Sequence, residues 1–163
     1  MVQKFTSQLL ALASDFHGFT MTELLVSMGI FTSLIAIAAP NFIANRPARQ
    51  LNGAARQVLS ELMWARSRAV EENNQFIVFF PTNHSLTILD DNNGNGTADA
   101  GEWTRTRDVQ IDFPGVTLTK GLGNPDPTFS PRGTAGGTTN ITVANPSGNL
   151  TIKINATGVV RID

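Results

Sequence analysis

Apolar residues dominate one stretch near the N-terminus. Residues 19–39 read FTMTELLVSMGIFTSLIAIAA, and Glu23 is the one ionisable side chain among them. As a helix, this stretch is long enough to cross a bilayer core about 30 Å thick. A core helix buried in a soluble domain is the alternative, but a domain of this size rarely surrounds such a helix on every side. We therefore predict a transmembrane helix over 19–39.

Residues 40–72 have a helical pattern of another kind. Steps of four and three separate the members of one apolar stripe: Leu51, Ala55, Val58, Leu62, Ala65 and Ala69. Polar residues such as Arg56, Glu61 and Arg68 mostly fall outside this stripe. The pattern predicts an amphipathic continuation of the first helix that docks on a sheet. Because proline lacks a backbone N–H, we expect a helix kink at Pro40 and a further bend near Pro47.

Beyond residue 73 the pattern changes to short runs rich in β-branched residues, separated by turn residues. The predicted strands cover residues 75–80, 85–89, 103–111, 116–119, 141–144, 150–154 and 159–162. The tight turns between neighbouring strands imply antiparallel pairing. One long helix followed by an antiparallel sheet is an α+β arrangement, with a globular head over 73–163.

Composition limits the function. The chain has no cysteine and two histidines, which excludes a disulfide framework, a structural zinc finger and a thiol nucleophile. We see no nucleophile–base set and no phosphate loop, so we expect no enzyme activity. The 12 basic and 13 acidic residues leave a net charge of −1, which argues against nucleic-acid binding through bulk basicity.

The residues at the start of the apolar stretch form a specific motif. Gly18 precedes Phe19, and the sequence GFTMTELLVSMGI places Glu23 fifth, counted from Phe19. This motif resembles the prepilin signature of type IV pilins and type II secretion pseudopilins. The resemblance implies a leader over 1–18 that a membrane-bound prepilin peptidase removes by cutting after Gly18. It also implies methylation of Phe19 as the new N-terminal residue.

Glu23 also calls for a physical explanation. An ionisable group inside an apolar helix costs about 2.5 to 3.5 kcal/mol on insertion scales, so it normally has a partner or a use. The resemblance implies a filament in which Glu23 pairs with the α-amino group of Phe19 in a neighbouring subunit and sets the axial register. The alternative is a solvated carboxylate near the membrane interface.

The globular half carries a looser resemblance. The segment FSPRGTAGG at 129–137 and the terminal TGVVRID at 157–163 resemble the GspH/FimT-type minor pseudopilins. The resemblance implies a pilin fold and a structural subunit at the tip of a type II secretion pseudopilus. Its partners would be the prepilin peptidase, other minor and major pseudopilins and the inner-membrane assembly platform. The chain would be anchored in the bacterial inner membrane, with its head in the periplasm.

Two related functions stay open at this point. A minor pilin for type IV pilus assembly would carry the same signature, and some relatives bind DNA for uptake through basic residues near the C-terminus. Here Lys153 and Arg161 are the only basic residues after Arg132. They are too few for the several phosphate contacts that give measurable affinity, so we do not expect nucleic acid as a partner.

One loop matches the twelve-residue calcium-binding pattern. Residues 91–102 read DNNGNGTADAGE, between two strand-like segments, and Gly96 permits the sharp turn. The pattern predicts a weak calcium site on a β-hairpin, with a Kd on the order of 10⁻⁴ to 10⁻³ M. The alternative is a polar hairpin loop that binds no ion. The candidate ligands are oxygen atoms of Asp91, Asn93, Asn95, Thr97, Asp99 and Glu102.

Overall fold

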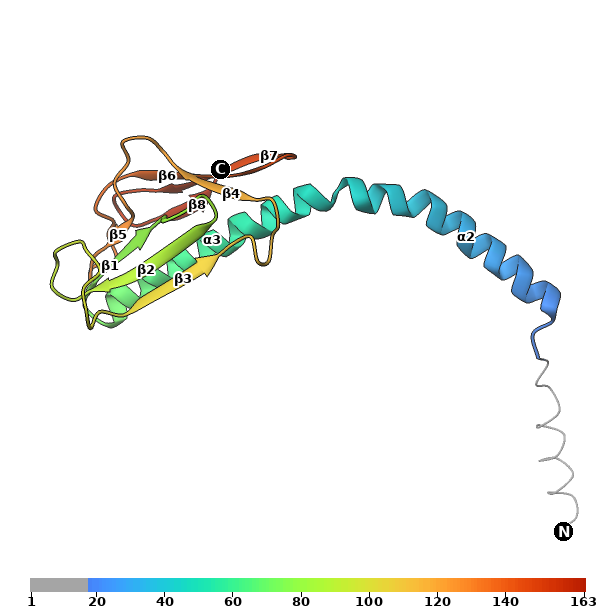
Figure 1. The fold of residues 1–163 in the computed structure, drawn as a ribbon, viewed down its shortest axis with the longest axis horizontal. Coiled ribbons are helices and arrows are strands. Elements are labelled where there is room, and N and C mark those ends of the chain that lie inside the picture. The colour runs from blue at the N-terminus through green and yellow to red at the C-terminus, as the bar shows by residue number, and fades with distance from the viewer. Residues whose placement is uncertain (1–17) are drawn as a thin grey trace, which may run out of the picture. The chain divides into compact units, whose positions relative to one another are not determined.

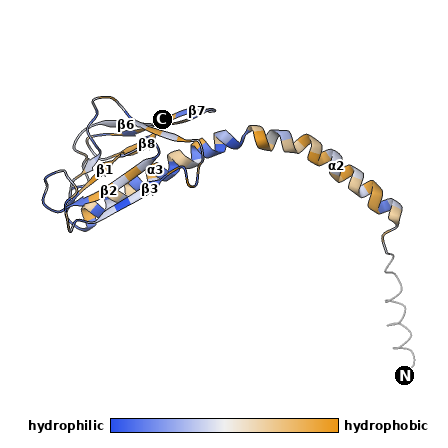
Figure 2. Cartoon of the chain, in the orientation of Figure 1, coloured by the Kyte–Doolittle hydropathy of each residue, from blue (hydrophilic) through white to orange (hydrophobic). Residues whose placement is uncertain are grey.

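The computed structural model describes residues 18–163, and the chain divides after Ala44 into two compact units. The first unit holds α2 (Met21–Ala44), whose described side chains are all exposed. Within 18–163, α2 is the one helix that is long and apolar enough to cross a membrane. Figure 2 shows this apolar character along the helix. The predicted apolar helix is therefore confirmed, and its surface is unsuited to water.

The second unit begins with α3 (Arg46–Glu71). The chain turns at Asn45, between the two helices, and Pro47 lies in the first turn of α3. A proline is tolerated there because the first helical N–H groups have no partner within their helix. The helix that we predicted as continuous over 40–72 is thus interrupted, since Pro47 cannot donate the hydrogen bond that would carry it through. Pro40 lies inside α2, and a kink there stays a prediction.

One face of α3 is buried. Its buried residues are Leu51, Ala54, Ala55, Val58, Glu61, Leu62, Ala65 and Ala69. These include every member of the predicted stripe, which is therefore confirmed. Glu61 is a correction, because we expected it outside the stripe and it is only 8% exposed. Alanines make up half of this face, which lets the helix backbone lie close to whatever covers it.

Between residues 72 and 163, eight strands form two antiparallel sheets. Sheet I has the strand order β3-β2-β1-β5, and sheet II has the order β4-β6-β7-β8. The pairs Ile77–Leu89 in sheet I and Ile141–Ile152 in sheet II show the register. The strands are β1 Gln75–Phe79, β2 Ser85–Asp91, β3 Thr104–Asp108, β4 Thr117–Lys120, β5 Thr128–Phe129, β6 Thr139–Asn145, β7 Gly148–Ile154 and β8 Val160–Ile162.

Both sheets pack on the buried face of α3. The helix contacts β1 and β5 of sheet I and β6, β7 and β8 of sheet II, and Figure 1 shows the strands of both sheets gathered along it. The core is one cluster that includes Phe76, Val78, Leu86 and Ile88 from sheet I and Ile141, Val143, Ile152 and Ile154 from sheet II. The α+β class and the pilin-like order of helix and sheet are therefore confirmed.

Several strand ends shift by one or two residues from the predicted ones, and the largest differences lie in two places. We predicted no strand near residue 128, and β5 is a two-residue strand that pairs with β1. The strand predicted over 103–111 ends at Asp108. There the Asp108 carboxylate accepts a hydrogen bond from the backbone N–H of Gln110 at 2.8 Å, which turns the chain.

The close contact between α3 and the sheets can be tested with Ala65→Leu. Ala65 is fully buried, so the added carbons must displace core side chains and should lower the free energy of unfolding by about 1 to 3 kcal/mol. Ser60→Leu makes a similar change on the exposed face of α3 and should alter this free energy by less than about 0.5 kcal/mol. Urea unfolding measures both variants, and equal effects would contradict the packing described here.

Candidate functional site

The predicted processing site lies just before α2. Gly18 and Phe19 are both exposed, and the Phe19 side chain is 87% exposed. A Cβ atom added at Gly18 would meet nothing within 4 Å, and this residue is not in the left-handed backbone region. Neither packing nor backbone conformation therefore requires glycine at position 18. Recognition by a processing enzyme would be a requirement that does not depend on the fold.

Glu23 has a structural role that sequence analysis missed. The backbone N–H and the hydroxyl of Thr20 donate hydrogen bonds to Glu23 Oε2 at 2.9 and 3.0 Å, and the Glu23 N–H donates to the Thr20 hydroxyl at 3.2 Å. This reciprocal arrangement is a capping box at the start of α2. A Thr three residues before a Glu, ahead of an apolar run, is its sequence signal. Pairing of Glu23 with a neighbour's α-amino group stays a prediction.

The ends of loop 91–102 are held by backbone amides. Asp91 is buried at the end of β2, and its two carboxylate oxygens accept hydrogen bonds from the N–H groups of Asn95 at 3.1 Å and Gly96 at 3.0 Å. The Glu102 carboxylate accepts from the N–H groups of Asn92 at 3.1 Å and Asp99 at 2.9 Å. The first and last predicted ligands thus close the loop.

The middle of the loop is hydrogen-bonded within itself. The amide groups of Asn93 and Asn95 donate to Asp99 Oδ2 at 2.8 and 2.6 Å. These bonds lower the pKa of Asp99, and the bond from Asn93 has the larger effect. The Asn95 Oδ1 atom accepts from Thr97. In the part of the chain that the structure describes, no three acidic or imidazole side chains converge on a metal-sized site. Calcium binding stays a prediction that would require these bonds to rearrange.

A polar cluster around Glu61 ties β3 to α3. Glu61 Oε1 accepts hydrogen bonds from Arg105 and Arg107, both at 3.2 Å. The Arg105 guanidinium also lies over the Trp64 ring, 4.8 Å from its centroid, and the Trp64 ring contacts the Trp103 ring with centroids 5.5 Å apart and the planes tilted by 40°. The sequence signal for this cluster was the position of Glu61, one residue before Leu62 of the apolar stripe, where a carboxylate lies next to the buried face. The cluster is structural, because it pairs a buried charge.

The sequence matches two family profiles. The profile described as "Type II transport protein GspH" covers residues 54–158, which is more than half of the chain. The profile described as "Prokaryotic N-terminal methylation motif" covers residues 14–39, a range that includes Gly18, Phe19 and Glu23. The two matches therefore fall on the head and on the apolar N-terminal segment.

Similar proteins are pilin-like. The pilin-like protein PilA1 of Thermus thermophilus is 32% identical over 145 residues, which cover 85% of this chain and 91% of that protein. The type IV minor pilin FimU of Pseudomonas aeruginosa is 18% identical with a TM-score of 0.58, over 71% of this chain and 90% of that chain. The minor pseudopilin EpsH from the type 2 secretion system of Vibrio cholerae is 15% identical with a TM-score of 0.54, over 70% of this chain and 96% of that chain. These two structures share the fold, and together with the profiles and PilA1 they show that the chain belongs to the GspH family of type IV pilin-like proteins.

Proposed function

We propose that this protein is a minor pseudopilin, a structural subunit at the tip of a type II secretion pseudopilus that supports protein export across the outer membrane. The observation that carries this proposal is the joint presence of an exposed apolar helix, α2, and a head that matches the GspH profile over 54–158. The family consists of structural pilin-like subunits, so we propose no catalytic role.

We further propose that a prepilin peptidase cuts after Gly18 and that Phe19 is then methylated. The methylation-motif profile supports this step, as does a glycine that the fold itself does not require. Before assembly, α2 lies in the inner membrane and the head lies in the periplasm. During assembly the protein contacts other pseudopilins and the inner-membrane assembly platform.

We propose that Glu23 pairs with the α-amino group of Phe19 in a neighbouring subunit, because such a pair would fix the axial position of α2 in the filament. When α2 leaves the bilayer for a filament core, it exchanges one apolar environment for another, so apolar contact alone gives little preference for one axial position. A carboxylate that must find a cation does give such a preference, because an unpaired charge in that environment is costly. The bonds from Thr20 use Oε2, and the pairing proposed here would use Oε1 of the same carboxylate.

A second candidate is a minor pilin of a type IV pilus. The fold shared with the type IV minor pilin FimU favours it, whereas the GspH profile and the fold shared with EpsH favour secretion. Both candidates use α2 and the head in the same way, and they differ in the machine that the subunit joins.

Deletion and complementation separate the two candidates. Loss of the gene should stop export of secreted proteins into the medium and leave surface piliation unchanged, and the full chain should restore export. Glu23→Val should fail to restore it, with export at least about tenfold below the full chain, as expected if a pairing free energy of about 1.4 kcal/mol is lost. Export is measured by activity of secreted enzymes, and piliation by sheared surface protein.

Ser33→Val is the matched control, because it also makes α2 more apolar and keeps the carboxylate. It should restore export fully. Intact-mass analysis should show that both variants begin at N-methylated Phe19, which separates failed assembly from failed processing. Full export with Glu23→Val would refute the pairing role, and lost piliation with normal export would assign the protein to the pilus.

We also propose that loop 91–102 binds calcium, on the strength of its ligand pattern. At calcium concentrations about ten times the Kd, binding would stabilise the head by about 1.4 kcal/mol. The melting temperature should therefore rise by several degrees, and EDTA should reverse the change. Glu102→Gln should abolish the response, whereas Asp112→Asn, a matched change outside the loop, should keep it. Equal melting temperatures in millimolar calcium and in EDTA would show that the loop binds no ion.

A further inference from the structure

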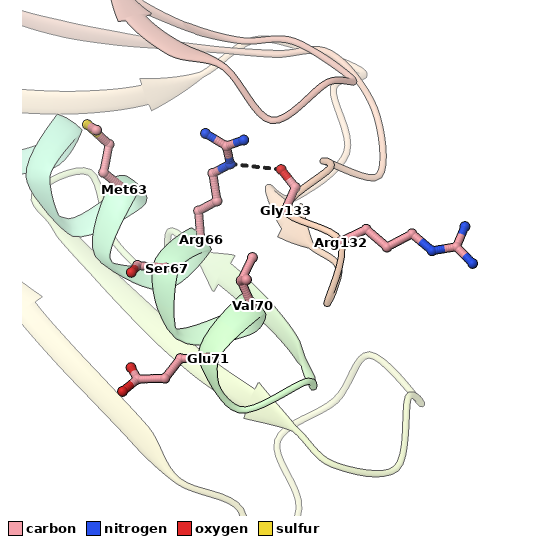
Figure 3. A pocket seen from close by; sticks show the side chains of 7 residues that line it. All are labelled: Met63, Arg66, Ser67, Val70, Glu71, Arg132 and Gly133. Atoms are coloured by element: carbon pink, nitrogen blue, oxygen red, sulfur yellow. Dashed lines mark hydrogen bonds between the residues drawn. The ribbon is translucent and has the colours of Figure 1, made fainter.

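A groove of about 630 Å³ lies between the C-terminal half of α3 and the loop that follows β5. Figure 3 shows it from close by. On the helix side it lies on the face of α3 that the sheets leave uncovered, since Met63, Ser67 and Val70 are exposed there. The complete lining is Met63, Arg66, Ser67, Val70, Glu71, Arg132 and Gly133.

The wall of the groove opposite the helix is held in place. Arg66 Nε donates a hydrogen bond to the Gly133 carbonyl at 2.8 Å, and the Gly133 N–H donates to the Ser130 carbonyl at 2.8 Å. Gly133 has a φ of 75°, and a Cβ atom at Gly158 would overlap the Gly133 carbonyl oxygen. Glycine at both positions therefore allows a close backbone approach that gives the groove a defined shape.

The groove carries uncompensated positive charge. Among residues 18–163, neither Arg66 nor Arg132 forms an ion pair, whereas Glu71, the one carboxylate of the lining, pairs at 3.2 Å with Arg68, which also pairs with Glu72. Since Arg66 uses Nε for Gly133, its two terminal nitrogens are free of that carbonyl, and Figure 3 shows them directed away from it. A guanidinium held in this way presents donors that suit a carboxylate. Most other basic residues of 45–163 are paired: Arg68, Arg105, Arg107, Lys120, Lys153 and Arg161.

The groove is also partly apolar. Met63 is 53% exposed and Val70 is 52% exposed, so an occupant that covers them gains hydrophobic contact. A free phosphate would leave these side chains in water. A nucleic acid would need more phosphate contacts than two arginines can supply. An acidic segment of a protein, with an apolar side chain beside its carboxylate, matches both features of the lining.

We propose that this groove binds an acidic segment of a neighbouring pilin-like subunit in the assembled filament. The partner's carboxylate lies on Arg66, with Arg132 at the rim, and an adjacent apolar side chain of the partner covers Met63 and Val70. The proposal rests on the proposed function only in taking the chain as a filament subunit. Beyond the proposed function, it specifies a contact of the groove with a neighbouring subunit, and the positive charge of the groove selects that subunit.

Site-specific crosslinking in the native host tests this contact. The full chain carries the photoreactive residue p-benzoylphenylalanine in place of Val70 and, as the control, in place of Leu122, an exposed residue outside the lining. Light should join position 70 to a different pilin-like protein, at a peptide with Asp or Glu within a few residues of the crosslink. Adding Arg66→Glu or Arg132→Glu should lower the yield about tenfold, and Arg56→Glu should not.

Two further measurements keep the test decisive. Arg132→Glu leaves the Arg66–Gly133 hydrogen bond intact, so it reports on charge even if Arg66→Glu unfolds the head. Replacing the partner's carboxylate with arginine should restore the crosslink to the Arg132→Glu chain. Crosslinks only to a second copy of this chain, only to nucleic acid, or equal in yield with Arg132→Glu would overturn the proposal. The secretion role can fail separately from the groove. If deletion of the gene leaves export normal, but the full chain still crosslinks through position 70 to a pilin-like subunit, the groove proposal is supported and the proposed role in secretion is refuted.

Discussion

The structure depends on removing one face of α3 from water. That face supplies Leu51, Val58 and Leu62 to the core together with four alanines, and each large apolar side chain so buried stabilises the fold by about 1.5 to 3 kcal/mol. Both sheets contribute to this core, since the helix contacts strands of each and the core cluster holds residues from both. The small alanine side chains set how closely the strands lie, and Glu61 in the same face holds β3 through two arginines.

The two helices have opposite relations to water. In α3 the apolar residues are concentrated on one face and are covered by the head's own strands. In α2 they lie all round, and no described residue of the chain buries them. A surface of that kind requires an apolar environment from outside the chain, either a bilayer or the helices of neighbouring subunits. This requirement accounts for an anchored subunit that can later enter a filament.

Sequence periodicity predicted those parts of the fold in which buried residues recur at a regular spacing. The stripe from Leu51 to Ala69 follows the helical period, so it was predictable residue by residue. The division into two sheets was not, because strand pairing depends on contacts between residues far apart in the chain. The two-residue strand β5 shows no alternation to detect, and Glu61 was misplaced because its arginines come more than 40 residues later.

The candidate sites divide in the same way. Gly18, Phe19 and Glu23 are local in sequence, and their motif was visible without a structure. The capping box of Thr20 and Glu23 is equally local, because a Thr three residues before a Glu is its sequence signal. In loop 91–102 the residue types agree with a calcium pattern, but residue types do not determine whether side chains such as Asn93 and Asn95 point their oxygens or their NH₂ groups inward. The groove beside Arg66 combines residues from α3 and from the loop after β5, which lie far apart in the sequence. A local sequence pattern therefore could not predict it.

The fold of residues 45–163 depends on the buried face of α3 and not on α2. Thermal unfolding of residues 45–163 alone, followed by circular dichroism in buffer without detergent, tests this dependence. We expect a soluble monomer that unfolds in one cooperative transition, because the core cluster lies entirely within this unit. Aggregation, or a gradual loss of signal with no transition, would contradict it.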